Sequence, residues 1–152
     1  MILGKKWFWR VMLVVYLAAL AYVCFANQGS LPKFDEWPFK IPADKCVHFV
    51  MFLPWPILAC LSVIAGPDRQ SKTPDQVGGD KHDQVGGDKW VAVMLIITII
   101  GLGLAGTTEW VQGLLPYRSK DIWDFIADSL GLLTGALLFA AFYPFLRKSR
   151  TR

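Results

Sequence analysis

The sequence has little of what zinc proteins, disulfide-rich proteins and common hydrolases use. It contains three cysteines and two histidines, and no two cysteines have the CxxC spacing. A disulfide framework or a structural zinc site is therefore not expected. No HExxH motif and no recognisable nucleophile occur, which argues against well-known catalytic classes. Charged residues make up 18% of the chain, and the basic ones gather at its ends and in one loop, so a nucleic-acid surface is not expected.

Apolar residues are abundant instead. Hydrophobic residues make up 54% of the 152 positions, and the mean hydropathy is +0.39, which is too apolar for an ordinary soluble domain. A helix needs about 20 mostly apolar residues to cross the membrane. Four stretches predict such helices, at residues 7–25, 45–64, 90–113 and 121–145. We therefore expect a single all-α domain over residues 1–152, a membrane-embedded antiparallel bundle of four transmembrane helices.

The basic residues predict the orientation of this bundle. The two chain ends and the loop 66–89 together carry eleven Lys and Arg, against five on the opposite side. The positive-inside rule then places both termini in the cytoplasm, with the chain in the cytoplasmic (inner) membrane. The first apolar stretch is too long for a signal peptide, so we expect it to remain uncleaved.

The loop 66–89 contains a short direct repeat, with Asp75–Lys81 followed by a second copy at Asp83–Lys89. Two copies of a polar, glycine-rich unit are too few for a solenoid. We expect a flexible cytoplasmic linker that arose by local duplication.

Polar residues concentrate near one end of three predicted helices. Helical spacing places Asp121, Asp124 and Asp128 on one stripe. A carboxylate in hydrocarbon costs about 2.5 to 3.5 kcal/mol, so such groups should turn inward and pair with cationic ones. We predict an ion-paired polar pocket on the outer side of the membrane, made of Asp44, Lys45, His48, Glu109, Gln112, Arg118, Asp121, Asp124 and Asp128.

Simpler roles exist for four of these residues. Asp121 and Asp124 could cap the last helix and favour its dipole. Lys45 could extend its ammonium group to the headgroup region, as lysines at helix ends do. His48 could be a buried histidine that is satisfied by a backbone carbonyl.

Prolines and small residues indicate how the helices bend and pack. Pro54 and Pro56 each remove a backbone donor, which predicts a bend in the second helix close to His48. Small residues spaced by four in the last helix predict close packing, which we expect against the third helix. These residues are Ala127, Gly131 and Gly135.

Together these residues resemble the VanZ-like family of small bacterial membrane proteins. The resemblance covers residues 42–143 and rests on an Asp-Lys pair followed by a histidine, a Glu followed by Gln, and an Arg followed by three Asp and two Gly. These residues are Asp44, Lys45, His48, Glu109, Gln112, Arg118, Asp121, Asp124, Asp128, Gly131 and Gly135. The family usually has Asn where this chain has Asp128. The family is named after a protein associated with low-level resistance to the glycopeptide teicoplanin, so the resemblance implies a role in the cell envelope.

Three functions remain open from the sequence. The first is a non-enzymatic protein whose pocket binds a lipid headgroup, a lipid-linked cell-wall precursor or a glycopeptide, with Arg118 and Lys45 holding an anionic ligand. The second is an intramembrane enzyme in which Glu109 or Asp128 acts as general base and His48 as acid, or in which these groups hold a divalent metal. The third is a structural partner of another membrane protein. We expect no cofactor or metal in the first case, and the oligomeric state stays open.

Overall fold

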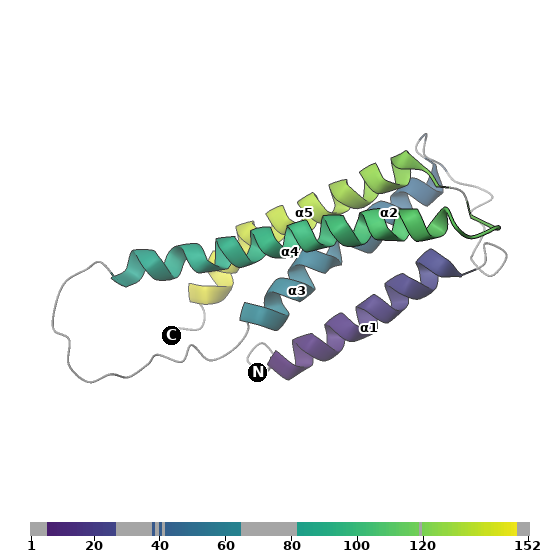
Figure 1. The fold of residues 1–152 in the computed structure, drawn as a ribbon. Helices are drawn as coiled ribbons and strands as arrows, with labels where there is room; N and C mark the ends of the chain where they lie inside the picture. Colours follow the sequence, from purple (N-terminus) through teal and green to yellow (C-terminus); the bar gives the residue numbers. More distant parts are fainter. Residues whose placement is uncertain are drawn as a thin grey trace.

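The computed structural model of the chain describes residues 6–26, 38, 40, 42–64, 82–118 and 120–148, and these residues form helices and turns without any strand (Figure 1). The helices are α1 (Lys6–Phe25), α2 (Ala43–Phe52), α3 (Pro54–Ile64), α4 (His82–Gln112) and α5 (Ile122–Lys148). The prediction of an all-α protein is therefore confirmed.

Four helical stretches have the length and composition to cross a membrane. They contain 20 to 24 residues, and their mean hydropathy lies between 1.8 and 2.2. At about 1.5 Å per residue, such lengths match the roughly 30 Å of bilayer hydrocarbon. The stretches are Lys6–Phe25, Ala43–Ile64, Lys89–Gln112 and Ile122–Phe145. The predicted set of four membrane-spanning helices is confirmed.

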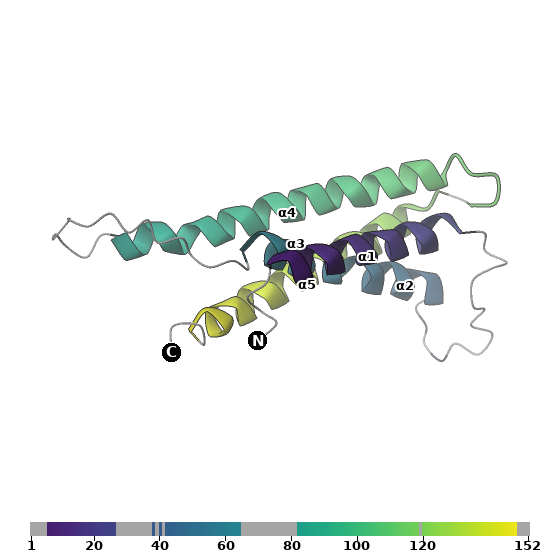
Figure 2. The same cartoon turned by 90° about the horizontal axis from the view of Figure 1, so that it is seen from below.

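The spans run alternately up and down the bundle. The start of α1 and the end of α5 lie at the same end, whereas the end of α4 and the starts of α2 and α5 lie at the other (Figures 1 and 2). Large apolar side chains such as Val14, Ile99 and Leu137 are exposed on the outside of the bundle, as contact with acyl chains requires. The buried core between the helices includes Phe52 and Leu132, both with no exposed surface.

The second span is bent, as its prolines predict. α2 ends at Phe52 and α3 begins at Pro54, with Leu53 in a turn between them. The bend thus lies at Leu53, five residues beyond His48 and directly before the first proline, because Pro54 has no N–H to continue the ladder. α2 packs chiefly against α5, whereas α3 packs against α1, α5 and α4. The second span therefore contacts all three of the others.

The small residues of α5 pack against a different helix from the expected one. A Cβ added at Gly131 would collide with the backbone oxygen of Phe49, and one added at Gly135 would collide with that of Leu53. These glycines therefore face the α2–α3 bend and not α4, and the prediction of their partner was wrong. The absence of a Cβ allows close backbone approach, and the bend provides the backbone that approaches. Ala127, one turn earlier, is also buried.

One helix boundary also differs from the prediction. α4 begins at His82, so the second copy of the repeat, Asp83–Lys89, is helical and not a flexible loop. That copy contains no proline, so the hydrogen-bond ladder of the span can continue through it. The first copy, Asp75–Lys81, lies outside the described residues.

Candidate functional site: a polar cluster at one end of the bundle

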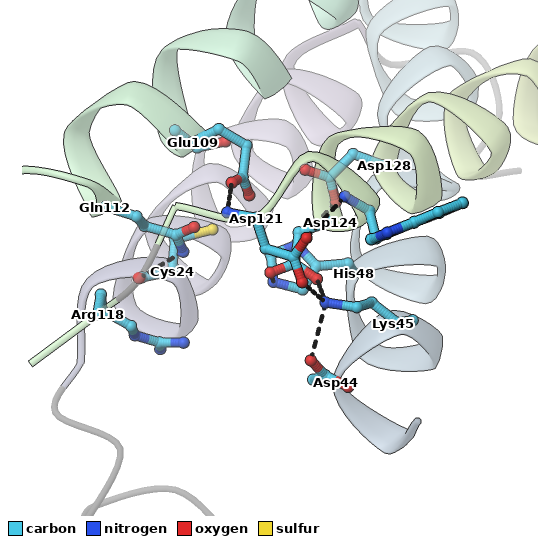
Figure 3. Close-up of polar contacts among 12 residues, drawn as sticks. Cys24, Asp44, Lys45, His48, Glu109, Gln112, Arg118, Asp121, Asp124 and Asp128 are labelled. Atoms are coloured by element: carbon cyan, nitrogen blue, oxygen red, sulfur yellow. Dashed lines mark hydrogen bonds and ion pairs between the residues drawn. The ribbon is translucent and has the colours of Figure 1, made fainter. Parts of the chain in front are cut away.

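Ionisable side chains from three helices meet where α2 and α5 begin and α4 ends (Figure 3). The antiparallel order of the spans brings these three ends together, although their residues lie up to 84 positions apart in the sequence. We call this set the polar cluster, and it consists of Asp44, Lys45, His48, Glu109, Asp121, Asp124 and Asp128.

Lys45 joins α2 to α5 through ion pairs. Its Nζ donates to Asp121 Oδ2 and to Asp124 Oδ1, both at 2.5 Å, and lies 3.1 Å from Asp44 Oδ2. The ammonium group is thus surrounded by three carboxylates. Lys45 therefore binds within the protein and does not extend freely to the headgroup region.

His48 and Asp128 form the deepest contact of the cluster. Asp128 has no exposed surface, and its Oδ1 lies 3.0 Å from His48 Nδ1. The other ring nitrogen, Nε2, lies 3.7 Å from Asp124 Oδ2. His48 is therefore satisfied by a carboxylate from another span, and not by a backbone carbonyl as the simpler reading supposed.

Glu109 enters the cluster from the end of α4. Its side chain is buried, and its Oε2 accepts a hydrogen bond from the backbone N–H of Asp121 at 3.3 Å. Its second oxygen, Oε1, is also buried and accepts no hydrogen bond within the part of the chain that the structure describes. A buried carboxylate oxygen without a donor is costly, so this atom is a sensitive point of the cluster.

Asp121 has two roles, and both sequence interpretations of it apply. Its Oδ1 accepts the backbone N–H of Trp123 at 3.0 Å, which caps α5, while its Oδ2 accepts a hydrogen bond from Lys45. Asp121 precedes the membrane-spanning part of α5. The hydrogen bonds from Lys45 and from the Trp123 backbone hold the pKa of Asp121 below its ordinary value of 3.8.

Two residues that were expected in the pocket bind elsewhere. Arg118 and Gln112, together with Tyr117, donate to carbonyl oxygens at the end of α1, which have no partners within that helix. The bonds run from Arg118 Nη2 to Val23 O (2.9 Å) and Ala26 O (3.3 Å), from Gln112 Nε2 to Cys24 O (2.9 Å), and from Tyr117 Oη to Phe25 O (3.2 Å). The predicted pocket thus divides into the polar cluster and a set of donors that holds α1.

The sequence contained a signal for this second set that we did not use. α1 ends without a basic residue in its last turn, so its final carbonyls need donors from another segment. Within the described residues, the end of α4 and the turn that follows it carry such donors, in Gln112, Tyr117 and Arg118.

Exposure falls steadily from the rim of the polar cluster to its floor. The exposed fractions of the side chains are 59% for Asp44, 34% for Asp121, 17% for Lys45, 12% for Asp124, 9% for His48 and 0% for Asp128. Five carboxylates therefore face one ammonium group and one imidazole, and two of the buried carboxylates, Glu109 and Asp128, have no contact with the ammonium group. The polar cluster therefore has more negative than positive groups, and an unpaired carboxylate costs more free energy the more deeply it is buried.

The fold and the cluster together define a multi-pass membrane protein with a buried ionic site at one end of its bundle. Residues 5–143 match the model of the VanZ/LLP1 family, and the chain belongs to this family. The resemblance seen in the sequence is thereby confirmed. Searches of the curated proteins and of the solved structures found no match.

Proposed function

We propose that the protein is a non-enzymatic component of the bacterial envelope. In this proposal it lies in the cytoplasmic membrane with both termini in the cytoplasm, and the polar cluster opens to the outer side. The excess of Lys and Arg at the chain ends supports this orientation, since the cluster lies at the bundle end away from the start of α1 and the end of α5. The cluster then binds the polar headgroup of an amphiphile.

The charges of the cluster favour a ligand with hydrogen-bond donors or an ammonium group. The accessible rim consists of Asp44 and Asp121, and Lys45 is already bound by carboxylates. Arg118, which the sequence suggested as a partner for an anion, donates to α1 instead. An amine-bearing lipid headgroup, a lipid-linked cell-wall precursor with a free amino group and a glycopeptide such as teicoplanin all have suitable donors.

The observation that carries this proposal is the graded exposure of the cluster, from the rim at Asp44 to the buried floor at Asp128. A purely structural set of ion pairs needs no exposed carboxylates arranged around its entrance. The family assignment supports an envelope role. The resemblance seen in the sequence adds the association with teicoplanin, because the family is named after a protein associated with low-level resistance to it.

The test uses the double variant Asp44→Asn, Asp121→Asn, expressed in a teicoplanin-sensitive bacterium that lacks the protein. Asparagine at residue 121 can still cap α5, so the fold is preserved while the rim loses both charges. We expect the wild type to raise the minimal inhibitory concentration of teicoplanin and the double variant to lose this effect, at equal abundance in the membrane. The exposed neighbour Lys120 provides the matched control, Lys120→Gln. Unchanged resistance in the double variant would contradict the proposal.

An intramembrane enzyme is the second candidate, because of the buried Glu109 oxygen that lacks a donor and the His48–Asp128 contact. Glu109 would act as general base and His48, oriented by Asp128, as general acid. Turnover of lipid-linked envelope substrates by the purified protein, abolished by Glu109→Gln, would favour this function over binding.

A role as structural partner through the small residues of α5 has less support. Gly131 and Gly135 lie against the α2–α3 bend of the same chain, so they are not available to another protein. Crosslinking in native membranes tests this third function directly.

A further inference from the structure

Three side chains of the polar cluster come close enough to share one metal ion. His48, Glu109 and Asp124 are all buried, and one ligand atom from each lies within 4.8 Å of the others. They come from three different helices, α2, α4 and α5, so only the folded chain assembles them. Figure 3 shows the three side chains converging between these helices.

Each of the three residues has one ligand atom that is not used by another strong contact. Asp124 binds Lys45 through Oδ1, which leaves Oδ2 directed at His48 Nε2, 3.7 Å away. Glu109 accepts a backbone N–H through Oε2, while its buried Oε1 has no partner within the described residues. An imidazole nitrogen and two carboxylate oxygens form a set that divalent transition metals bind.

Asp128 holds His48 in the way that carboxylates hold metal-binding histidines. Its Oδ1 lies 3.0 Å from Nδ1, so it can accept the Nδ1–H and leave the lone pair of Nε2 toward Asp124. A carboxylate behind a histidine fixes the tautomer and raises the basicity of the free nitrogen. Asp128 is itself fully buried, so this orientation is maintained by the core.

The buried carboxylates of the polar cluster outnumber its cationic groups, so the cluster needs a further cation. Glu109, Asp124 and Asp128 are buried, and the nearby cationic groups are Lys45 and, when protonated, His48. Arg118 donates to carbonyl oxygens of α1 and makes no ion pair with these carboxylates. A buried surplus of carboxylates is unfavourable unless a cation or protons neutralise it.

We propose that the protein binds one divalent transition-metal ion, such as Zn²⁺, through His48 Nε2, Glu109 Oε1 and Asp124 Oδ2, with Asp128 as a positioning residue. In a tetrahedral zinc site with bonds of about 2.1 Å, two ligand atoms lie about 3.4 Å apart, so the side chains close by at most about 1.4 Å around the ion. Three protein ligands leave a coordination position open toward the rim. The site lies at the floor of the polar cluster, below the rim carboxylates Asp44 and Asp121 that the headgroup proposal uses, and it replaces the expectation from the sequence that a non-enzymatic protein holds no metal.

The experiment uses the full chain, purified in detergent micelles, treated with a chelator and titrated with Zn²⁺ against a metal indicator. We expect one ion per chain. Near-isosteric Glu109→Gln and the change His48→Gln should each lower the affinity at least tenfold. Asp128→Asn should lower it about 10- to 100-fold while circular dichroism stays unchanged. Lys120→Gln, at an exposed position outside the polar cluster, should bind like the wild type and serves as the matched control.

A second measurement needs no variant, which matters if a substitution disturbs folding. X-ray absorption of the zinc-loaded wild type should show one imidazole and oxygen ligands, with no sulfur. Sulfur in the first shell would place the ion at a cysteine and overturn the proposal. Stoichiometry well below one, or wild-type affinity in both Glu109→Gln and His48→Gln, would overturn it as well.

Discussion

Replacing Asp128 by Asn should make the protein more stable, although it removes an ionised partner of His48. Asp128 is fully buried at membrane depth, where a carboxylate costs about 2.5 to 3.5 kcal/mol. Asparagine removes that cost and keeps an oxygen that accepts the histidine N–H. It loses the charged character of that hydrogen bond, which is worth about 1 to 1.5 kcal/mol. The balance is a gain of about 1 to 2.5 kcal/mol in the free energy of unfolding.

The assay is an unfolding titration of the metal-free protein with sodium dodecyl sulfate in mixed micelles at neutral pH, followed by circular dichroism. The transition of Asp128→Asn should move to a higher mole fraction of dodecyl sulfate. The control Asp44→Asn changes a carboxylate that is 59% exposed, so it should stay within about 0.5 kcal/mol of the wild type. If Asp128→Asn were no more stable than the wild type, the estimate of the burial cost would be refuted.

Three further predictions concern packing, pH and the end of α1. Gly131→Leu should destabilise the bundle by about 1 to 3 kcal/mol, because the new side chain would push α5 away from α2. Gly103→Leu should be tolerated, because a Cβ added there meets no neighbouring atom within 4 Å. The same unfolding titration compares the two variants. The pKa of Asp121 is lowered in the folded protein, so the ionised side chain contributes its full stability above the ordinary pKa of 3.8. This stability is lost as the pH falls through the lower pKa of the folded state. Asp121→Asn should make stability fall less steeply with acid, and an equally steep fall would contradict the role of Lys45. Arg118→Ala should lower the free energy of unfolding by about 1 to 3 kcal/mol, because carbonyl oxygens of α1 lose their donor. The amount of protein in the membrane should fall as well. An amount equal to that of the wild type would show that α1 does not need this residue.

The spans and the existence of the cluster were predictable because their causes are local. Apolar length alone determines which segments can cross a bilayer, and helix rise then sets the depth of residues such as Glu109 and Asp128. The cost of a carboxylate in hydrocarbon requires such groups to turn inward. Which groups meet then follows from the antiparallel order, so a contact such as His48 with Asp128 was within reach of sequence reasoning.

The errors arose where the answer depended on which neighbour a surface meets. Spacing by four identifies Gly131 and Gly135 as a close-packed stripe, but not that the α2–α3 bend would occupy it. Charge alone suggested that Arg118 would bind a carboxylate. Arg118 instead binds the end of α1, whose carbonyl oxygens carry only partial charges. That α1 ends beside the α4–α5 turn is decided by tertiary packing, which the sequence pattern does not reveal.

The central claim is that charged groups from separate spans neutralise one another inside the bundle, and the pair Lys45 and Asp124 tests it most directly. A double-mutant cycle with Lys45→Met, Asp124→Asn and the double variant, measured by the same unfolding titration, isolates their interaction. We predict a favourable coupling of about 1 to 3 kcal/mol, with the double variant more stable than the sum of the single losses implies. Losses that add within about 0.3 to 0.5 kcal/mol would show that the two residues do not interact and would contradict the account.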